Sequence, residues 1–330
     1  MNIYKEVING SEIIYINEDS YWQKPVITEK QIFENLFNNK IIPYNYIAFP
    51  WASYIDNIWT QKFNKLEQMI NEEITNKQLI DNNKTYFTVV QHIFFRDYID
   101  KFKQLNIKYI FTPHKSKTDY ELEEKYNICI IPISLFPKQN NTSNLVIELQ
   151  HKKYLTSFIG QIIHEHMISN IREKIYEYFK DKQDCLIKSN DNWYYQPCVY
   201  SNYDVTKEDD VTKEDDVFYK QIMRESKFSL CPSGTGPNSI RLWESLSFGC
   251  IPIILADTLC LPTIPEIDYN DFCIIWKEEN ITTLYDYLLT IDNDKINKMS
   301  NKCIEIYNEF FSENSLHKPI ICYFSKYIYI

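Results

Sequence analysis

A stretch of the chain at residues 227–257 combines a glycine turn with a cation and a carboxylate a little further on. Three of the five glycines of the chain lie in it. The turn at residues 232–237 presents backbone N–H groups beside the positive end of a helix, an arrangement that binds phosphate or diphosphate. Arg241 and Glu244 are three residues apart and share one face of that helix. This stretch would be a nucleotide site if Arg241 bound the diphosphate and Glu244 bound the ribose hydroxyls.

The residues around the turn predict the elements that position it. We expect a strand at residues 228–231, a helix capped by Asn238 or Ser239 that runs to about residue 248, and a buried strand at 251–256. Gly249 suits the left-handed position after a helix. An ordinary packing turn between two strands, with no ligand, has the same pattern.

The segment CPSGTGPNSIRLWESLSFGCIPIIL resembles the signature of the exostosin-type glycosyltransferases, which have the GT-B fold. The likeness is specific over residues 217–257 and looser over 85–175. Ser233 departs from the family, whose members often carry Arg or Lys there. The resemblance implies a donor site for a nucleoside diphosphate sugar made of the following residues: Gly160, Arg172, Ser233, Gly234, Thr235, Gly236, Asn238, Ser239, Arg241 and Glu244.

Two members of this predicted site lie upstream of the glycine turn. Gly160 ends a predicted strand at residues 153–159, which resembles the family strand that ends in F-x-G. Arg172 belongs to an I-R run like that of the family and would add positive charge near the phosphates. The alternative is a surface arginine beside Glu173 and Glu177.

Composition limits the class of protein. The chain has 330 residues, of which 44% are hydrophobic, enough for two globular domains. A net charge of −10 argues against a nucleic-acid partner, which needs a basic surface. Nine cysteines without a C-x-x-C motif predict free thiols in a reducing compartment. We find no signal-peptide pattern and no apolar run of eighteen residues, and therefore expect a cytoplasmic enzyme without the membrane anchor of the Golgi members.

Strands that alternate with helices predict the fold. Apolar strands are expected at residues 43–50, 85–95, 108–113 and 127–136, with a loop at 51–56 and a helix at 58–74 between the first two. Residues 1–40 predict a short hairpin and a helix near 29–38. We therefore predict an α/β protein of the GT-B fold, with two Rossmann-like parallel-sheet domains facing across a cleft.

The domain bounds follow from an Asn-rich connector at residues 137–148. We expect an acceptor domain at residues 1–147 and a donor domain at 148–315. The apolar segment at 316–330 is expected to pack back on the first domain, and peripheral contact with a membrane is the alternative. A duplicated hexapeptide, DVTKED at 204–209 and again at 210–215, predicts a solvated loop before a helix at 217–226.

Inversion at a sugar carbon requires a base that takes the proton of the acceptor hydroxyl. His92 and Asp56 fall at the predicted carboxyl ends of strands in the first half, where ligands of parallel sheets bind. One of the two is our predicted base, with His114, Asp97 and Asp119 as weaker candidates. His92 could instead be a packed histidine, and Asp56 could cap the helix expected after it.

We expect no metal and no cofactor. H-E-H at residues 164–166 lacks the spacing that puts two ligands on one helical face, and D-x-D at 292–294 is expected to be a turn and helix cap. The predicted reaction moves a sugar from a nucleoside diphosphate sugar, UDP in preference to GDP, to a hydroxyl of a glycan or glycolipid, with inversion. A non-catalytic carbohydrate-binding protein and a nucleotide-sugar epimerase of the same fold are the alternatives.

Overall fold

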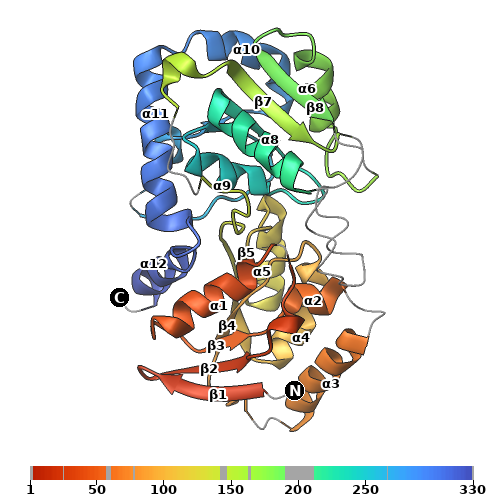
Figure 1. Ribbon diagram of the computed structural model, residues 1–330. Helices are drawn as coiled ribbons and strands as arrows, with labels where there is room; N and C mark the ends of the chain where they lie inside the picture. Colours follow the sequence, from red (N-terminus) through yellow and green to blue (C-terminus); the bar gives the residue numbers. More distant parts are fainter. Residues whose placement is uncertain are drawn as a thin grey trace. The chain divides into compact units, whose positions relative to one another are not determined.

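The computed structural model describes residues 3–24, 26–56, 61–76, 79–141, 147–162, 165–189, 212–265 and 267–328. The chain divides into two compact units, each with its own sheet (Figure 1). Unit 1 comprises Met1–Leu135, Thr258–Pro265 and Glu313–Ile330, and unit 2 comprises Phe136–Asp257 and Glu266–Ser312. Two Rossmann-like units confirm the predicted fold class, which is α/β of the GT-B type.

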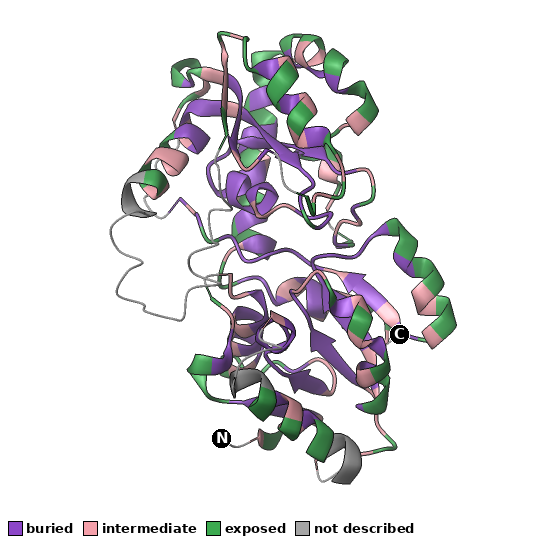
Figure 2. Ribbon diagram, turned by 90° about the vertical axis from the view of Figure 1, so that its right-hand side faces the viewer, coloured by how far each residue is buried: buried purple, intermediate pink, exposed green. Residues whose placement is uncertain are grey.

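Unit 1 contains a six-stranded sheet in the sequential order β1 to β6. Its strands are β1 (Ile3–Ile8), β2 (Ser11–Ile16), β3 (Tyr46–Ala48), β4 (Tyr86–Val89), β5 (Ile107–Thr112) and β6 (Cys129–Pro132). The first two form the predicted hairpin, whose turn residues Asn9 and Gly10 have φ of 50° and 87°. The other pairs are parallel. Most of strands β2 to β5 is buried (Figure 2), as expected for a sheet covered on both faces.

Six α-helices accompany this sheet in the described residues of unit 1. They are α1 (Thr28–Asn38), α2 (Trp51–Asp56), α3 (Gln61–Asn76), α4 (Ile99–Gln104), α5 (Tyr120–Tyr126) and α12 (Lys318–Tyr327). Helix α2 corrects the loop predicted at 51–56. Its Trp51, Ala52 and Tyr54 are at most 1% exposed, so burial of this short apolar face offsets the weak helix propensity of the sequence.

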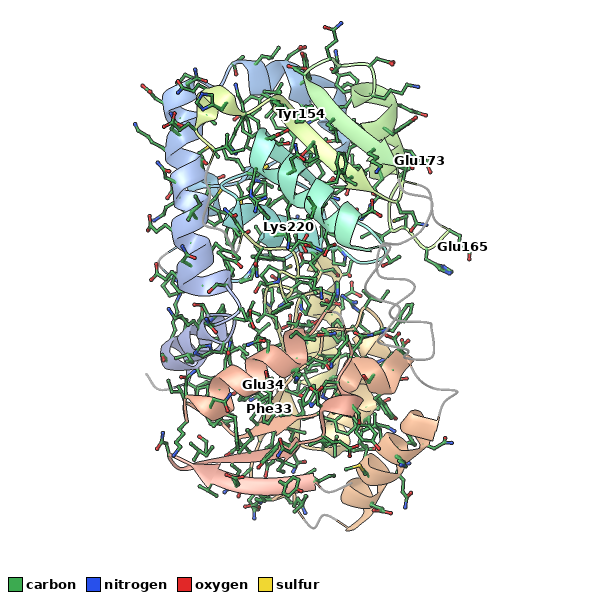
Figure 3. All side chains as sticks on the ribbon, in the orientation of Figure 1. Phe33, Glu34, Tyr154, Glu165, Glu173 and Lys220 are labelled. Atoms are coloured by element: carbon green, nitrogen blue, oxygen red, sulfur yellow. The ribbon has the colours of Figure 1, made fainter. Side chains whose placement is uncertain are left out.

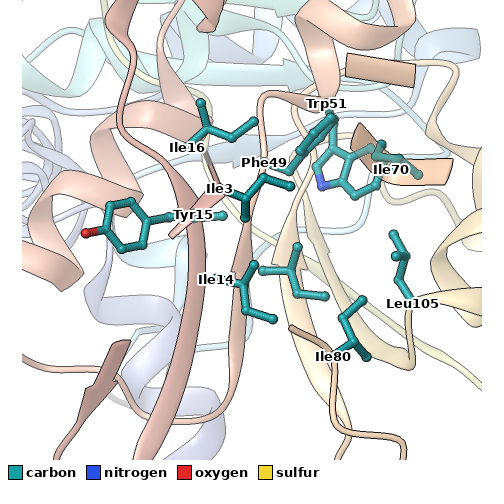
Figure 4. Close-up of a pocket in the computed structure, with 11 residues that line it drawn as sticks. Ile3, Ile14, Tyr15, Ile16, Phe49, Trp51, Ile70, Ile80 and Leu105 are labelled. Atoms are coloured by element: carbon teal, nitrogen blue, oxygen red, sulfur yellow. The ribbon is translucent and has the colours of Figure 1, made fainter. Parts of the chain in front are cut away.

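The core of unit 1 contains one small gap, shown in Figure 4. Its volume is about 30 Å³, and Ile14, Ile70 and Ile80 are among the apolar side chains that surround it. A space of this size and lining is a packing defect rather than a ligand site.

Helix α12 closes the core of unit 1 through Phe324, which is fully buried. The Phe324 ring lies 5.0 to 5.6 Å, centroid to centroid, from the rings of Tyr44, Phe87, Tyr109 and Phe111. The segment predicted to pack on the first domain thus supplies part of that domain's hydrophobic core.

Truncation of Phe324 to alanine should lower the free energy of unfolding by about 3–5 kcal/mol, because it removes a buried ring and leaves a cavity. Urea denaturation followed by tryptophan fluorescence measures the loss. Tyr327→Ala on the same helix is the matched control, since Tyr327 is 50% exposed, and it should cost far less. Equal losses for the two variants would contradict this role of α12.

Unit 2 contains a five-stranded parallel sheet in the order β11-β10-β9-β7-β8. The strands are β7 (Tyr154–Gly160), β8 (Cys185–Ser189), β9 (Ser226–Pro232), β10 (Ile251–Leu255) and β11 (Ile274–Ile275). The helices are α6 (Ile171–Phe179), α8 (Thr212–Glu225), α9 (Ile240–Ser247), α10 (Ile281–Leu289) and α11 (Asn293–Ile306). Figure 1 shows α8 in front of this sheet and α6 behind it. Helix α8 begins at Thr212, so the end of the predicted acidic loop is helical, and residues 204–211 lie outside the described residues.

The compact units differ from the predicted domain bounds in three places, the smallest of which is residues 313–315, which group with unit 1. Residues 136–147 group with unit 2, because the Gln139 and Asn141 N–H groups donate to the Glu244 and Ser247 side chains of α9. Thr258–Pro265 groups with unit 1, where Leu259 forms an antiparallel bridge to Ser116. These ties join residues more than a hundred positions apart, which sequence pattern does not reveal.

No helix among the described residues combines the length and the apolar character needed to cross a bilayer.

Candidate functional site

The order of the strands in unit 2 defines a place for a ligand. The chain passes from β7 to β8 on one side of β7 and then to β9 on the other side. The crevice outside the carboxyl ends of β7 and β9 is therefore a topological switch point, where open α/β sheets bind their ligands. Gly160 ends β7, and the glycine turn follows Pro232 at the end of β9. Gly160 and the glycine turn, which are the two parts of the predicted donor site, both lie at this switch point.

The glycine turn differs from the prediction in how its N–H groups are used. The Ser233 N–H donates to the Leu255 carbonyl at 3.0 Å, and the Gly234 N–H donates to the Gly236 carbonyl at 3.0 Å. Neither N–H is therefore available to an anion. The expectation that the Gly234 amide holds a phosphate is wrong, because the turn satisfies that donor internally.

The side chains of the turn also point to protein partners. The Ser233 hydroxyl lies 3.2 Å from that of Ser169, and Asn238 Oδ1 accepts a hydrogen bond from the Trp243 indole. Ser239 occupies the N-cap position of α9 but makes no side-chain capping bond. Thr235 is exposed.

Two guanidinium groups supply the positive charge of the crevice. Arg172 on α6 donates from Nε to the Ser233 carbonyl and from Nη1 to the Gln161 carbonyl, both at 2.8 Å. Arg241 on α9 donates to the Ile159 carbonyl and is only 8% exposed. Both guanidiniums lie over the ring of Phe158, at 5.7 and 4.9 Å from its centroid.

These two cations interact with each other, and Glu244 is a carboxyl group whose charge interacts with Arg241. Among the described residues, neither guanidinium lies within salt-bridge distance of a carboxylate, and both bond carbonyl oxygens instead. Burial, and then the charge of Arg241, lower the pKa of Arg172 to about 10. Such a pair is costly to keep in the absence of a ligand and favours the binding of a multiply charged anion. Glu173, the alternative partner of Arg172, projects from the surface of unit 2 (Figure 3).

Gly234 permits the close approach of Arg172, whereas Gly160 lies at ordinary contact distance from Arg241. A Cβ on Gly160 would lie 3.5 Å from Arg241 Nη2, and a Cβ on Gly234 would lie 2.7 Å from Arg172 Nη2. The second distance is shorter than any real contact of a Cβ, and two hydrogen bonds pin the Arg172 side chain. Gly234 thus acts through its missing side chain and not through its amide.

Gly234→Ala should weaken UDP binding about tenfold while lowering the melting temperature only slightly, because the alanine displaces Arg172. Calorimetric titration with UDP measures the affinity. Gly249→Ala is the contrasting variant. Gly249 has φ of 58°, and its added Cβ would meet Ser300 Oγ at 2.7 Å, so that variant should lose stability and keep its UDP affinity. The reverse pattern would show that Gly234 serves the fold alone.

Glu244 lies deeper in the same crevice and is 2% exposed. Its Oε1 accepts the Gln139 N–H at 2.9 Å and its Oε2 accepts the Tyr219 hydroxyl at 2.7 Å. Burial raises the pKa of Glu244 to about 7. Each carboxylate oxygen retains a further acceptor position, so Glu244 can bind a ligand hydroxyl without losing its protein partners.

A cavity of about 130 Å³ unites these groups. Five of the ten predicted donor-site residues line it; four of the others belong to the turn at residues 232–237, and the fifth, Asn238, follows that turn. The lining residues from the prediction are Gly160, Arg172, Ser239, Arg241 and Glu244. Pattern reasoning missed further lining residues: Gln139, Phe158, Lys188, Phe218 and Tyr219. The F-x-G run that ends at Gly160 could have identified Phe158 as a site residue. Gln139 lies in a segment that was predicted to be a connector, and its sequence gives no indication of a site.

The two predicted base candidates are in direct contact in unit 1. His92 Nε2 lies 2.7 Å from Asp56 Oδ1, and the two side chains are 11% and 20% exposed. Asp56 ends α2, and His92 follows β4. Residues 36 positions apart thus form one dyad at the carboxyl edge of the sheet.

The weaker candidates have other roles. Asp119 is 1% exposed and accepts two hydrogen bonds from Arg96, at 2.6 and 2.7 Å, which joins the loops after β4 and β5. Burial lowers the pKa of His114 to about 3, and its Nδ1 has no partner among the described residues. Asp97 lies in a one-turn 3₁₀-helix at Phe95–Tyr98.

Two sequence motifs, H-E-H at residues 164–166 and D-x-D at 292–294, were predicted not to be metal sites. Asp292 caps α11 by accepting the Lys295 N–H at 2.7 Å, as predicted. Glu165 and His166 are exposed and pair at 3.3 Å, and His164 lies outside the described residues. Within the described ranges, no three His, Cys, Asp or Glu side chains form a group that could hold a metal ion.

The two α/β units, each built on a mainly parallel sheet, define a protein of the GT-B fold class. Residues 61–291 match the family model of the exostosin GT47 domain, which is more than half of the chain. The chain therefore belongs to the exostosin GT47 family of glycosyltransferases.

Curated relatives match parts of the chain. A segment of 78 residues, 24% of this chain, is 40% identical to a probable glucuronosyltransferase of Oryza sativa subsp. japonica and covers 19% of that protein. A segment of 162 residues, 48% of this chain, is 24% identical to the exostosin-1 homolog of Caenorhabditis elegans and covers 41% of it. The matched segments thus span less than half of either relative.

Solved structures resemble the chain more loosely. TarM aligns over 78% of this chain and 53% of its own, with 13% identity and a TM-score of 0.43. The pneumococcal O-GlcNAc transferase GtfA, in complex with UDP and GlcNAc, aligns over 98% and 69%, with 11% identity and a TM-score of 0.41. Likeness at this level adds nothing to the family assignment.

Proposed function

We propose that this protein transfers a sugar from a nucleoside diphosphate sugar to a hydroxyl of a glycan or glycolipid, in the synthesis of a surface polysaccharide or glycoconjugate. The observation that carries the proposal is the pair of guanidiniums, half-buried Arg172 and buried Arg241, in one cavity with the carboxyl of Glu244. Membership of a glycosyltransferase family supports it.

The leaving group is the first part of the proposed mechanism. As the bond between sugar and diphosphate breaks, negative charge grows on the diphosphate. Arg172 and Arg241 stabilise that charge in a buried site, where a fixed positive group is worth more than in water. Two fixed cations supply what a metal ion supplies elsewhere, so we propose that transfer proceeds without one. We propose UDP, in preference to GDP, as the nucleotide that leaves.

The nucleophile is the second part. The Phe94 N–H donates to His92 Nδ1 at 3.1 Å, and a backbone N–H can only donate. The neutral imidazole therefore carries its hydrogen on Nε2 and donates it to Asp56 Oδ1. Both ring nitrogens of His92 are occupied, whereas the Asp56 carboxylate keeps free acceptor positions. We assign the base to Asp56 and an orienting role to His92, and a single displacement with this base inverts the sugar carbon.

The direct test incubates the purified protein with a panel of UDP-sugars and GDP-sugars, with and without glycan acceptors. Release of nucleoside diphosphate that depends on the acceptor, and that persists in EDTA, is the expected result. Isomerisation of the donor without an acceptor would identify an epimerase. Sugar binding with neither reaction would identify a carbohydrate-binding protein, and either outcome would overturn the proposal.

Glu244 predicts a pH dependence of nucleotide affinity. Ribose hydroxyls donate to the ionised carboxylate, whose pKa is about 7, so UDP affinity should rise as the pH increases through 7. Glu244→Gln should remove this dependence and bind UDP about tenfold more weakly at pH 8. Titration calorimetry between pH 6 and 8 measures both effects. An analogue that carries uracil and diphosphate but no ribose should bind more weakly than UDP. Equal affinity for the two ligands would exclude this role of Glu244.

A further inference from the structure

A chain of amide groups leads from helix α1 to the Asp56 carboxylate. The Glu29 N–H donates to Gln91 Oε1 at 3.1 Å, and Gln91 Nε2 donates to Gln23 Oε1 and to the Val26 carbonyl, both at 2.7 Å. Gln23 Nε2 then donates to Asp56 Oδ2. These hydrogen bonds join three parts of unit 1: positions 23 to 29, the end of α2 and the residues after β4.

The direction of every bond in this chain is determined. Glu29 lies in the first turn of α1, where a backbone N–H has no helical partner and can only donate. Gln91 must therefore present its oxygen to Glu29 and its NH₂ to the Val26 carbonyl, which can only accept. The same NH₂ fixes Gln23 with its oxygen toward Gln91 and its own NH₂ toward Asp56. An amide that is otherwise free to flip is thus held as a donor.

The residues that hold this series of amide groups are themselves buried and hydrogen-bonded. Gln91 is 5% exposed, and its own N–H donates to Glu29 Oε1 at 2.9 Å. Both oxygens of Glu29 also accept the Ala52 N–H, at 3.1 and 3.2 Å, at the start of the helix that ends at Asp56. Asp56 is accordingly held from two directions, by His92 on Oδ1 and by Gln23 on Oδ2.

We propose that Gln23 is a positioning residue for the base: it donates to Asp56 Oδ2 and fixes the direction in which the free lone pairs of that carboxylate point. This inference rests on the proposed function, in which Asp56 takes the proton of the acceptor hydroxyl. Loss of the Gln23 donor releases one side of the carboxylate, so that its lone pairs no longer meet the acceptor hydroxyl in a fixed direction. The titratable groups that face the dyad are Glu29, whose charge interacts with Asp56, and His114, which interacts with His92.

The test is a double-variant cycle measured on sugar transfer. Gln23→Leu should lower kcat about tenfold in the parent protein, because the Asp56 lone pairs lose their fixed direction, and should lower it no further in the Asp56→Asn background. UDP affinity should not change in either background. Gln31→Leu is the matched control, since Gln31 is buried on α1 and bonds Asn35 instead.

Equal losses of kcat from Gln23→Leu in the parent and in the Asp56→Asn background would overturn the proposal. If Gln23→Leu does not fold, Gln23→Glu decides the question, because it preserves the shape of the side chain and presents an oxygen where the donor was. Absence of acceptor-dependent transfer by the parent protein would refute the proposed function itself, whereas transfer with additive losses would refute the positioning role alone.

Discussion

Asparagine in place of Asp56 should lower kcat by about two to four orders of magnitude, the usual contribution of a general base. The affinity for UDP should not change, because Asp56 belongs to unit 1 and the residues that line the donor cavity belong to unit 2. Steady-state assays of nucleotide release in the presence of acceptor measure kcat, and calorimetry measures UDP affinity.

His92 provides the graded comparison for this prediction. His92→Gln retains an N–H that can donate to Asp56 and should lower kcat by only about tenfold, whereas His92→Ala removes the donor and should cost more. A larger loss for His92→Gln than for Asp56→Asn would reverse the two roles. Near-normal turnover of both Asp56→Asn and His92→Ala would eliminate the dyad as the source of the base.

Removal of either guanidinium of the crevice should weaken UDP binding by about 30- to 100-fold, since a hydrogen bond to a charged group is worth roughly 2–3 kcal/mol. Arg172→Ala and Arg241→Ala each leave one cation, and the double variant should bind UDP too weakly for titration. Uridine, which lacks the diphosphate, should bind each single variant as it binds the parent. That contrast separates a lost charge from a damaged cavity.

Arg224→Ala is the matched control for both arginine variants. Arg224 lies on α8 in the same unit, donates to Asn141 Oδ1, and is not among the residues that line the cavity. Its loss should leave UDP affinity within a factor of two or so. Parent-like UDP affinity in Arg172→Ala and Arg241→Ala would show that the diphosphate binds elsewhere.

The sequence predicted the parts of the molecule that local pattern controls. The strand, turn and helix around Gly234, the left-handed Gly249 and the cap at Asp292 depend on residues within a few positions of one another. His92 and Asp56 were each placed at a strand or helix end, but nothing in the sequence showed that they touch. Their pairing arises because the carboxyl ends of parallel strands meet at one edge of a sheet.

The parts that sequence could not supply depend on contacts between distant residues. Gln23 and Gln91 are 68 positions apart, and Gln139 and Glu244 are 105 positions apart. Glutamine has no strong pattern signal, since an exposed amide and a buried donor look alike in a sequence. The use of the Gly234 N–H by its own turn was hidden for a similar reason, because residue type does not reveal which backbone donors are already satisfied.

The position of Phe324 in the core of unit 1 has a consequence for the order of folding. Its ring partners Phe87, Tyr109 and Phe111 leave the ribosome more than two hundred residues before it does, and all of unit 2 is synthesised in between. Until α12 arrives, the aromatic face of β4 and β5 lacks its cover and is open to aggregation. Unit 2 can complete its own sheet earlier. Completion of unit 1 is therefore the late step, and under the proposed function a nascent chain arrested before residue 318 should bind UDP without transferring a sugar.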